Sequence, residues 1–257
     1  MSIGLSQHQI EIERNRQAWE RKPLLRAIYE SFYARILPLI DRAVPGRIVE
    51  IGSGIGNLKS HLPSSISTDL FPNPWLDAVC DTYELPFASK SLSHLILFDV
   101  FHHLQAPNMF LIEARRVLAP GGRVLLFEPF ISLSSWPAYG CLHHEPVAWR
   151  KAIDLADSLA RPRMYYAAQG NATRLFFEEQ ISGWPAHWEI FHREAFACFS
   201  YLLSGGFSRP AFYPASFLGC LQRADHWLSR FPKLFGARCL VGLRCGGEVV
   251  FGGNAHA

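Results

Sequence analysis

The chain has 257 residues, of which 49% are hydrophobic and 18% are charged, so it can bury a full core and is not a disordered chain. Its 25 basic and 22 acidic residues give a net charge of +3, which is too small to indicate nucleic-acid binding. The whole excess lies within residues 1–47. We interpret it as a solvated helix face, and a patch that meets an acidic substrate or a membrane surface is the alternative.

The cysteines and the opening residues indicate the compartment. None of the 6 cysteines forms a Cys-x-x-Cys pair, so no zinc site of that kind is expected. Residues 1–20 are polar and charged, unlike a signal peptide. The longest apolar run, Leu95–Phe98, is far shorter than the roughly 20 residues that span a bilayer. We therefore expect a cytoplasmic protein without stable membrane insertion, and we leave its oligomeric state open.

An N-terminal helical arm is predicted over residues 1–46. Residues 6–41 favour two helices broken near Pro23, because apolar side chains from Leu24 to Ile36 recur at spacings of three and four. Pro45 and Gly46 are typical of the turn that would end this arm.

Short apolar segments alternate with helical segments from residue 47 onward. We predict strands at 48–51, 66–69, 92–100 and 123–128, with helices at 57–62 and 109–118. This alternation predicts an α/β fold, a doubly wound parallel sheet covered on both faces. Residues 47–257 would then form one domain.

Residues 131–192 interrupt that alternation and are rich in tryptophan and tyrosine. We predict an inserted lid that carries substrate contacts between the fifth and sixth strands, with a helix over 147–160. Further on we predict a helix over 193–203, a strand over 207–214, a helix over 218–231 and a last strand over 237–243. The aromatic content favours an apolar, aromatic or sugar-like substrate, with ordinary core packing as the alternative.

Three glycines, Gly52, Gly54 and Gly56, follow the first predicted strand. Ligands of α/β proteins bind where parallel strands end, and glycine lets the backbone approach them closely. A dinucleotide fingerprint would place its third glycine at position 57, where Asn57 stands. This departure opposes a pyrophosphate ligand and hence a nicotinamide-dependent oxidoreductase. A purely structural turn is the other alternative.

Polar side chains also follow the later strands. Asp69 comes 17 residues after Gly52 and suits the two hydroxyls of a ribose, with a helix N-cap as the alternative. His102 and His103 follow the strand that ends near residue 100. Two adjacent histidines are expected to point in different directions and to chelate poorly, so no metal site is expected.

Several of these segments occur together in one order along the chain: Val49–Gly56, Asp69, Asp81 ahead of Leu85–Phe87, Phe98–Leu104 and Leu118–Gly122. In this order the chain resembles the class I S-adenosylmethionine-dependent methyltransferases, and most closely the type-11-like branch that methylates small molecules. The resemblance covers roughly residues 47–130. It implies a Rossmann-like sheet of seven strands with an antiparallel last strand, and S-adenosyl-L-methionine as the cofactor.

The resemblance also implies the cofactor contacts. These are Glu50, Gly52, Ser53, Gly54, Gly56, Asp69, Leu70, Asp81, Thr82, Phe98, Asp99 and His103. By the resemblance, Glu50 and the glycine turn line the methionine and ribose, Asp69 holds the ribose hydroxyls and Leu70 packs on the adenine. Asp81 and Thr82 would meet the adenine amino edge. One departure is Pro72 and Pro74, which stand where the family continues directly into a helix.

A sulfonium methyl group is already activated, so the protein has to align the reactants, exclude water and, for a hydroxyl nucleophile, accept a proton. His143, His144 and Glu145 form the most suggestive cluster for a base, because a histidine beside a carboxylate titrates near neutral pH. His103 is a further candidate. Lesser candidates are His102, His187, His192 and Glu128.

We therefore expect S-adenosylmethionine-dependent methyl transfer to a small molecule, with O-methylation slightly favoured. A non-catalytic protein that binds the cofactor for regulation or assembly is the first alternative, because no residue compels a catalytic base. A nicotinamide-dependent oxidoreductase is less favoured.

Overall fold

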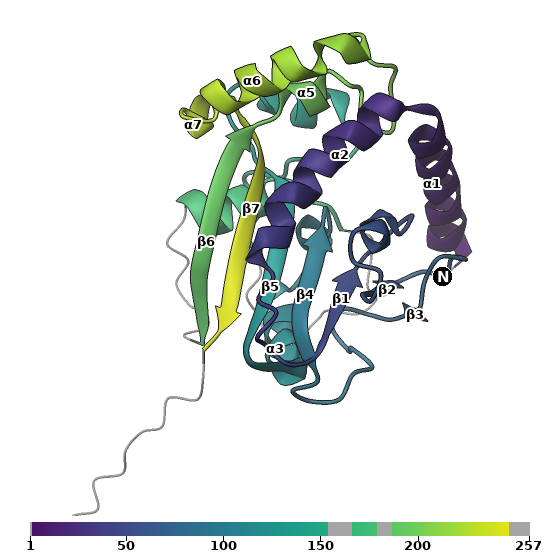
Figure 1. The fold of residues 1–257 in the computed structure, drawn as a ribbon, viewed down its shortest axis with the longest axis vertical. Helices are drawn as coiled ribbons and strands as arrows, with labels where there is room; N and C mark the ends of the chain where they lie inside the picture. Colours follow the sequence, from purple (N-terminus) through teal and green to yellow (C-terminus); the bar gives the residue numbers. More distant parts are fainter. Residues whose placement is uncertain (1, 154–165, 179–186, 247–257) are drawn as a thin grey trace, which may run out of the picture.

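The computed structural model describes residues 2–153, 166–178 and 187–246, and it contains one sheet with the strand order β3-β2-β1-β4-β5-β7-β6 (Figure 1). The strands are β1 (Arg47–Ile51), β2 (Ile66–Asp69), β3 (Ala78–Val79), β4 (Leu92–Phe98), β5 (Leu118–Pro129), β6 (Trp188–Ala197) and β7 (Gly236–Cys245). β1 to β5 are parallel, whereas β7 runs antiparallel to both β5 and β6. The predicted antiparallel last strand is therefore confirmed.

Helices cover both faces of the sheet. They are α1 (Ser2–Arg21), α2 (Pro23–Ile36), α3 (Pro107–Val117), α4 (Asn171–Thr173), α5 (Phe199–Leu202), α6 (Leu218–Leu228) and α7 (Pro232–Phe235). Successive strand residues face opposite sides, so Ile96 packs with α2 while Leu95 and Leu97 pack with α3. The doubly wound arrangement is thus confirmed. No helix in these ranges is long and apolar enough to cross a membrane.

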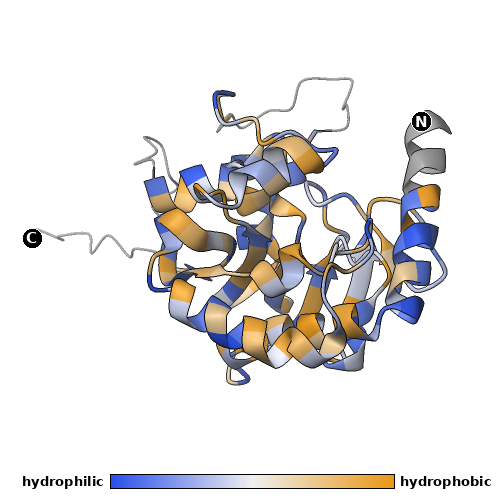
Figure 2. Cartoon of the chain, turned by 90° about the horizontal axis from the view of Figure 1, so that it is seen from above, coloured by the Kyte–Doolittle hydropathy of each residue, from blue (hydrophilic) through white to orange (hydrophobic). Residues whose placement is uncertain are grey.

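The N-terminal arm consists of two helices that are held very differently. The helix break predicted near Pro23 is confirmed, because α1 ends at Arg21 and α2 begins at Pro23. α2 buries seven side chains, whereas α1 is largely hydrophilic (Figure 2) and buries only Ile12 and Ala18 among its described side chains. The Lys22 ammonium between them donates to two backbone carbonyls, one being that of Gly206 at 2.6 Å. The domain boundary at residue 46 stays a prediction.

The sixth strand differs from the prediction. Residues 207–214 form turns, and the strand is β6, so residues 188–192 belong to the sheet and not to the predicted lid. The helix predicted over 193–203 is correspondingly wrong over most of its length, because only α5 is helical there. Pairing with β7 buries Trp188 and Phe196, and this long-range contact overrides the local helical spacing.

Three further segments test the predicted helices. The segment predicted as a helix over 57–62 forms a short 3-10 turn at Asn57–Ser60. The helix predicted over 147–160 is wrong for residues 147–153, which are irregular, and residues 154–160 lie outside the described ranges. No helix joins β2 to β3 in the described chain, since Pro72 and Pro74 replace it with a loop.

Candidate functional site

The turn after β1 lies at the carboxyl edge of the sheet and has left-handed backbone at all three glycines. The φ angles of Gly52, Gly54 and Gly56 are 67°, 53° and 74°. A Cβ atom on Gly52 would lie 2.4 Å from Val100, so this glycine lets the turn pack against the end of β4. A Cβ atom on Gly54 would have only Ile12 of α1 near it, at 3.9 Å. The space between Gly54 and α1 can therefore admit a ligand.

Asp69 ends β2 and meets this turn, as the spacing predicts. The backbone N–H of Gly54 donates to Asp69 Oδ2 at 3.1 Å, and the N–H of Leu70 donates to Oδ1 at 2.7 Å. The Asn73 side chain donates to the Gly54 carbonyl at 3.0 Å and closes the loop over the turn. Because no helix follows Asp69, the N-cap alternative is wrong.

The remaining residues expected on this side lie along the same edge. Asp81 follows β3 and accepts the backbone N–H of Tyr83 at 2.9 Å. Leu70 is 55% exposed, so its side chain is available to a ligand rather than packed in the core.

Asp99 follows β4 and forms an ion pair that the sequence analysis did not identify. Its backbone φ is 56°, a left-handed conformation that aspartate tolerates better than most residues. Its carboxylate pairs with Arg238 at the start of β7. Arg238 is 2% exposed and its guanidinium lies 4.6 Å from the centre of the Tyr201 ring. A charged residue within the apolar run 237–243 was the available sequence signal.

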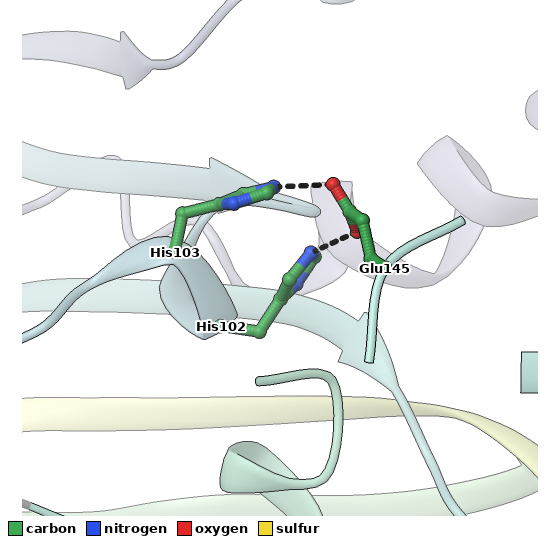
Figure 3. Close-up of side chains that lie close together, drawn as sticks. All are labelled: His102, His103 and Glu145. Atoms are coloured by element: carbon green, nitrogen blue, oxygen red, sulfur yellow. Dashed lines mark hydrogen bonds and ion pairs between the residues drawn. The ribbon is translucent and has the colours of Figure 1, made fainter. Parts of the chain in front are cut away.

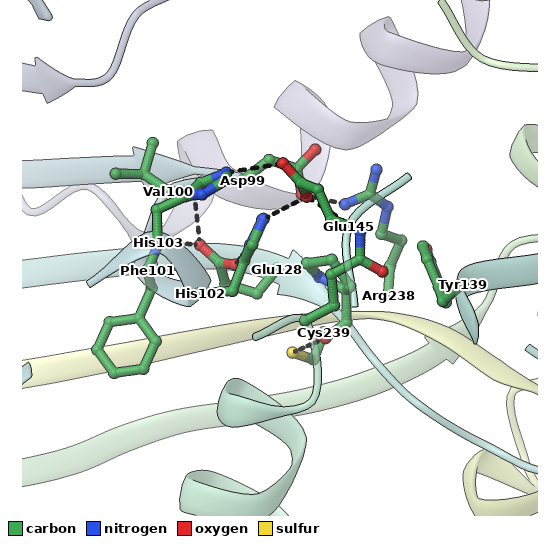
Figure 4. A network of polar contacts seen from close by, with 12 residues as sticks. Asp99, Val100, Phe101, His102, His103, Glu128, Tyr139, Glu145, Arg238 and Cys239 are labelled. Atoms are coloured by element: carbon green, nitrogen blue, oxygen red, sulfur yellow. Dashed lines mark hydrogen bonds and ion pairs between the residues drawn. The ribbon is translucent and has the colours of Figure 1, made fainter. Parts of the chain in front are cut away.

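Glu128, at the end of β5, organises the turn that carries the paired histidines (Figure 4). Its Oε1 accepts the backbone N–H groups of Val100 and Phe101 at 2.9 and 2.6 Å, and its Oε2 lies 2.7 Å from His102 Nδ1. Glu128 is fully buried. It therefore caps the neighbouring turn and orients His102.

His102 and His103 both point at Glu145, which comes from the segment between β5 and β6 (Figure 3). His102 Nε2 lies 3.3 Å from Glu145 Oε2, and His103 Nε2 lies 3.4 Å from Glu145 Oε1. The expectation that adjacent histidines diverge is therefore wrong. The short 3-10 turn Phe101–His103 sets the two rings 4.1 Å apart at 40° to each other.

The other candidate bases lie farther from this cluster. His143 Nδ1 and His144 Nε2 are each 3.9 Å from a Glu145 oxygen, and the His144 side chain is 62% exposed. His187 and His192 lie before and within β6, away from the carboxyl edge. The structure thus brings the four predicted catalytic residues together around Glu145, with His103 and the added His102 nearest to its carboxylate.

Comparison with protein families finds a match to the methyltransferase domain over residues 49–126, which covers β1 to β5 up to Leu126. Residues 49–126 therefore carry a methyltransferase domain, as the resemblance to the class I S-adenosylmethionine-dependent methyltransferases implies. The strand order with antiparallel β7 agrees with this assignment, and S-adenosyl-L-methionine is the cofactor. No curated protein matches the chain.

Several solved methyltransferases are similar to the chain. An S-adenosylmethionine-dependent methyltransferase from Thermotoga maritima is 16% identical, with a TM-score of 0.47 over 91% of this chain and 97% of its own. Geranyl diphosphate C-methyltransferase from Streptomyces coelicolor is 12% identical, with a TM-score of 0.44 over 84% and 79%. Phosphoethanolamine N-methyltransferase 2 from Haemonchus contortus is 13% identical, with a TM-score of 0.42 over 84% and 53%.

Along the carboxyl edge of the sheet, the methyltransferase domain has buried polar atoms without a hydrogen-bond partner among the described residues, and these atoms fit S-adenosylmethionine. Glu50, at the end of β1, is buried, and its Oε2 has no hydrogen-bond partner among the described residues. The same holds for the Thr82 hydroxyl. Burial raises the pKa of Glu50 to about 8. A cationic ligand such as a sulfonium or ammonium group would compensate this carboxylate.

The pKa values of His102 and His103 in the methyltransferase domain are shifted in opposite directions. Burial alone would lower the pKa of His102, but Glu128 and Glu145 raise it to about 10. Burial lowers the pKa of His103, and the neighbouring His102 charge lowers it further. His103 is therefore unprotonated at neutral pH and able to accept a proton.

Proposed function

We propose that the chain transfers the methyl group of S-adenosylmethionine to a hydroxyl oxygen of a small molecule. The proposal depends mainly on one observation, the covering of the carboxyl edge by two separate segments. Ile12 of α1 lies over Gly54, and the segment after β5 places Glu145 against His102 and His103. An acceptor has to fit between these covers, which favours a small molecule over a macromolecule.

The proposed cofactor contacts follow the carboxyl edge. Glu50, Gly52, Ser53, Gly54 and Gly56 would surround the methionine and ribose, with Asp69 on the ribose hydroxyls. The open space at Gly54 and the unpartnered Glu50 oxygen support this assignment. The adenine would meet Leu70, Asp81 and Thr82, while Phe98, Asp99 and His103 would border the transferred methyl group.

The proposed proton acceptor is the cluster around Glu145. A hydroxyl nucleophile needs a group that takes its proton as the carbon–oxygen bond forms. His103 and Glu145 adjoin His102, and a ligand atom of His102 lies within 4.8 Å of the carboxylate of Asp99, which is proposed to border the methyl group. The acceptor is proposed to be apolar, aromatic or sugar-like, which the exposed Trp136, at 42%, in the segment after β5 supports.

The test is transfer of a labelled methyl group from S-adenosylmethionine into a metabolite extract that has been freed of protein and nucleic acid. We expect label in a small molecule, a loss of about 100-fold or more in H103A, and no change in H226A, which removes an exposed histidine of α6. Tight cofactor binding without any transfer would favour the non-catalytic alternative. Binding of NADH instead, followed by fluorescence, would favour the oxidoreductase.

A further inference from the structure

We propose that His102, His103 and Glu145 bind one divalent transition-metal ion, with zinc as the best match. The inference rests on the proposed function and deepens it. In the ion-bound protein, coordination would lower the pKa of the acceptor hydroxyl and release its proton to solvent, so the ion would replace His103 as the group that activates the hydroxyl. Two imidazole nitrogens and one carboxylate are a ligand set found in zinc enzymes whose metal keeps an open coordination position. The two neighbouring histidines come from the turn after β4, and Glu145 comes from a segment 42 residues farther along the chain.

The distances between the ligand atoms suit a tetrahedral ion. Bonds of about 2.0–2.1 Å from zinc to nitrogen or oxygen place two tetrahedral ligands about 3.3–3.4 Å apart. His102 Nε2 lies 3.3 Å from Glu145 Oε2 and His103 Nε2 lies 3.4 Å from Glu145 Oε1, so each histidine is at this spacing from one oxygen of the carboxylate. One ligand atom from each of the three residues falls within 4.8 Å of the other two. A small shift of the side chains would therefore admit an ion.

The groups behind the ligands orient them as metal ligands are usually oriented. His103 Nδ1 lies 2.9 Å from the Tyr166 carbonyl, which can only accept a hydrogen bond, so Nδ1 carries the proton. Glu128 Oε2 likewise accepts a hydrogen bond from His102 Nδ1, at 2.7 Å. Nε2 of both rings then faces Glu145, and an ion would displace the proton that His102 carries there in the ion-free protein. Metal-binding histidines almost always donate their other ring nitrogen to a carboxylate or a carbonyl.

The carboxylate ligand is supported in the same way. The Gln169 amide donates to Glu145 Oε2 at 3.1 Å and so orients the Glu145 carboxylate. Glu145 is 9% exposed. In the ion-free protein the proton of His102 lies between this ring and the Glu145 carboxylate. A single divalent ion in its place would contact all three ligands and offset more of the buried charge of Glu128 and Glu145.

The position of Asp99 indicates that the ion would bind the methyl acceptor. Its carboxylate lies within 4.8 Å of the ligand atoms of His102 and Glu128. The ion would thus lie within about one imidazole ring of Asp99, the residue proposed to face the methyl group. An oxygen of the acceptor would complete the coordination, which selects acceptors with a hydroxyl or carboxylate at the reacting end.

The test is metal binding by the full-length protein after treatment with a chelator. We expect calorimetric titration to show one zinc ion per chain, and cobalt substitution to give the visible bands of a tetrahedral nitrogen and oxygen site. H103A and E145Q should abolish stoichiometric binding. The matched controls H226A and E189Q, which change exposed residues elsewhere, should bind as the unchanged protein does.

E128Q provides a variant that preserves shape. Its amide oxygen still accepts the backbone N–H groups, but it cannot orient His102 as the carboxylate does, so we expect binding about 10–100-fold weaker. Absence of stoichiometric binding by the unchanged protein would overturn the proposal. So would binding retained by both H103A and E145Q, or cobalt–thiolate bands, which would place the ion on cysteines. Zinc binding without methyl transfer would reject the proposed function and leave the metal site standing.

Discussion

The two halves of the carboxyl edge are assembled in different ways. On the cofactor side, Gly54 contacts Asp69 and Asn73, which lie 15 and 19 residues away. On the acceptor side, the contacts of His102 with Glu145 and of Asp99 with Arg238 span 43 and 139 residues. The first half is set by turns between residues close in the sequence, whereas the second depends on how distant segments meet. Variants of each half should therefore fail differently.

The largest effect is expected at Arg238, on the acceptor side. R238A should lower the free energy of unfolding by about 3–5 kcal/mol. The substitution leaves the Asp99 carboxylate without its ion-pair partner and removes the cation that packs against three aromatic rings. Chemical denaturation measures this loss. The double variant R238A/D99N should recover part of it, and a strictly additive loss would show that the pair is not coupled.

The glycine turn should lose binding and keep the fold. In G54V the branched side chain would fill the space beneath Ile12, so we expect cofactor affinity to fall more than about 100-fold, or ~3 kcal/mol. The left-handed backbone adds about 1–2 kcal/mol of destabilisation. Calorimetry and circular dichroism separate the two effects. G219A, on the exposed side of α6 with no atom near the added methyl, is the control.

Asp69 should show a smaller effect on the same side. D69A should weaken cofactor binding by about 1–3 kcal/mol, since the ribose hydroxyls would be left unpaired and Gly54 would lose its acceptor. D69N keeps one oxygen for Gly54 and should lose less. Equal cofactor affinity in D69A and the unchanged protein, measured calorimetrically, would reject the assigned role.

The smallest effect per pH unit is expected for the ionisation of Glu50. The pKa of Glu50 is raised from 4.5 to about 8, so the stability it contributes is full below pH 4.5 and is lost as pH rises through 8. The slope for the cofactor-free protein is at most about 1.4 kcal/mol per pH unit. E50Q should flatten it. A cationic cofactor stabilises the carboxylate, so binding near pH 7 should release a proton, seen by calorimetry in buffers of different ionisation enthalpy.

The sequence was sufficient for the parallel strands of the central sheet and for the glycine turn after β1. Buried strands such as β4 and the glycine turn leave local signals, namely apolar runs and left-handed positions. β6 was missed because its residues bury apolar surface only after β7 has folded beside them. The same holds for the histidine pair, whose convergence depends on Glu145, and for Arg238. Such groupings exist only in the tertiary structure, so sequence spacing does not predict them.

The weak attachment of α1 has a consequence for the timing of turnover. Spent cofactor has to leave from beneath a helix that buries only Ile12 and Ala18 among its described side chains, while Lys22 secures the start of α2. The exit route can therefore open by swinging one helix about Pro23, with the hydrophobic core undisturbed. We expect the departure of the product, rather than the bond exchange, to govern the catalytic rate.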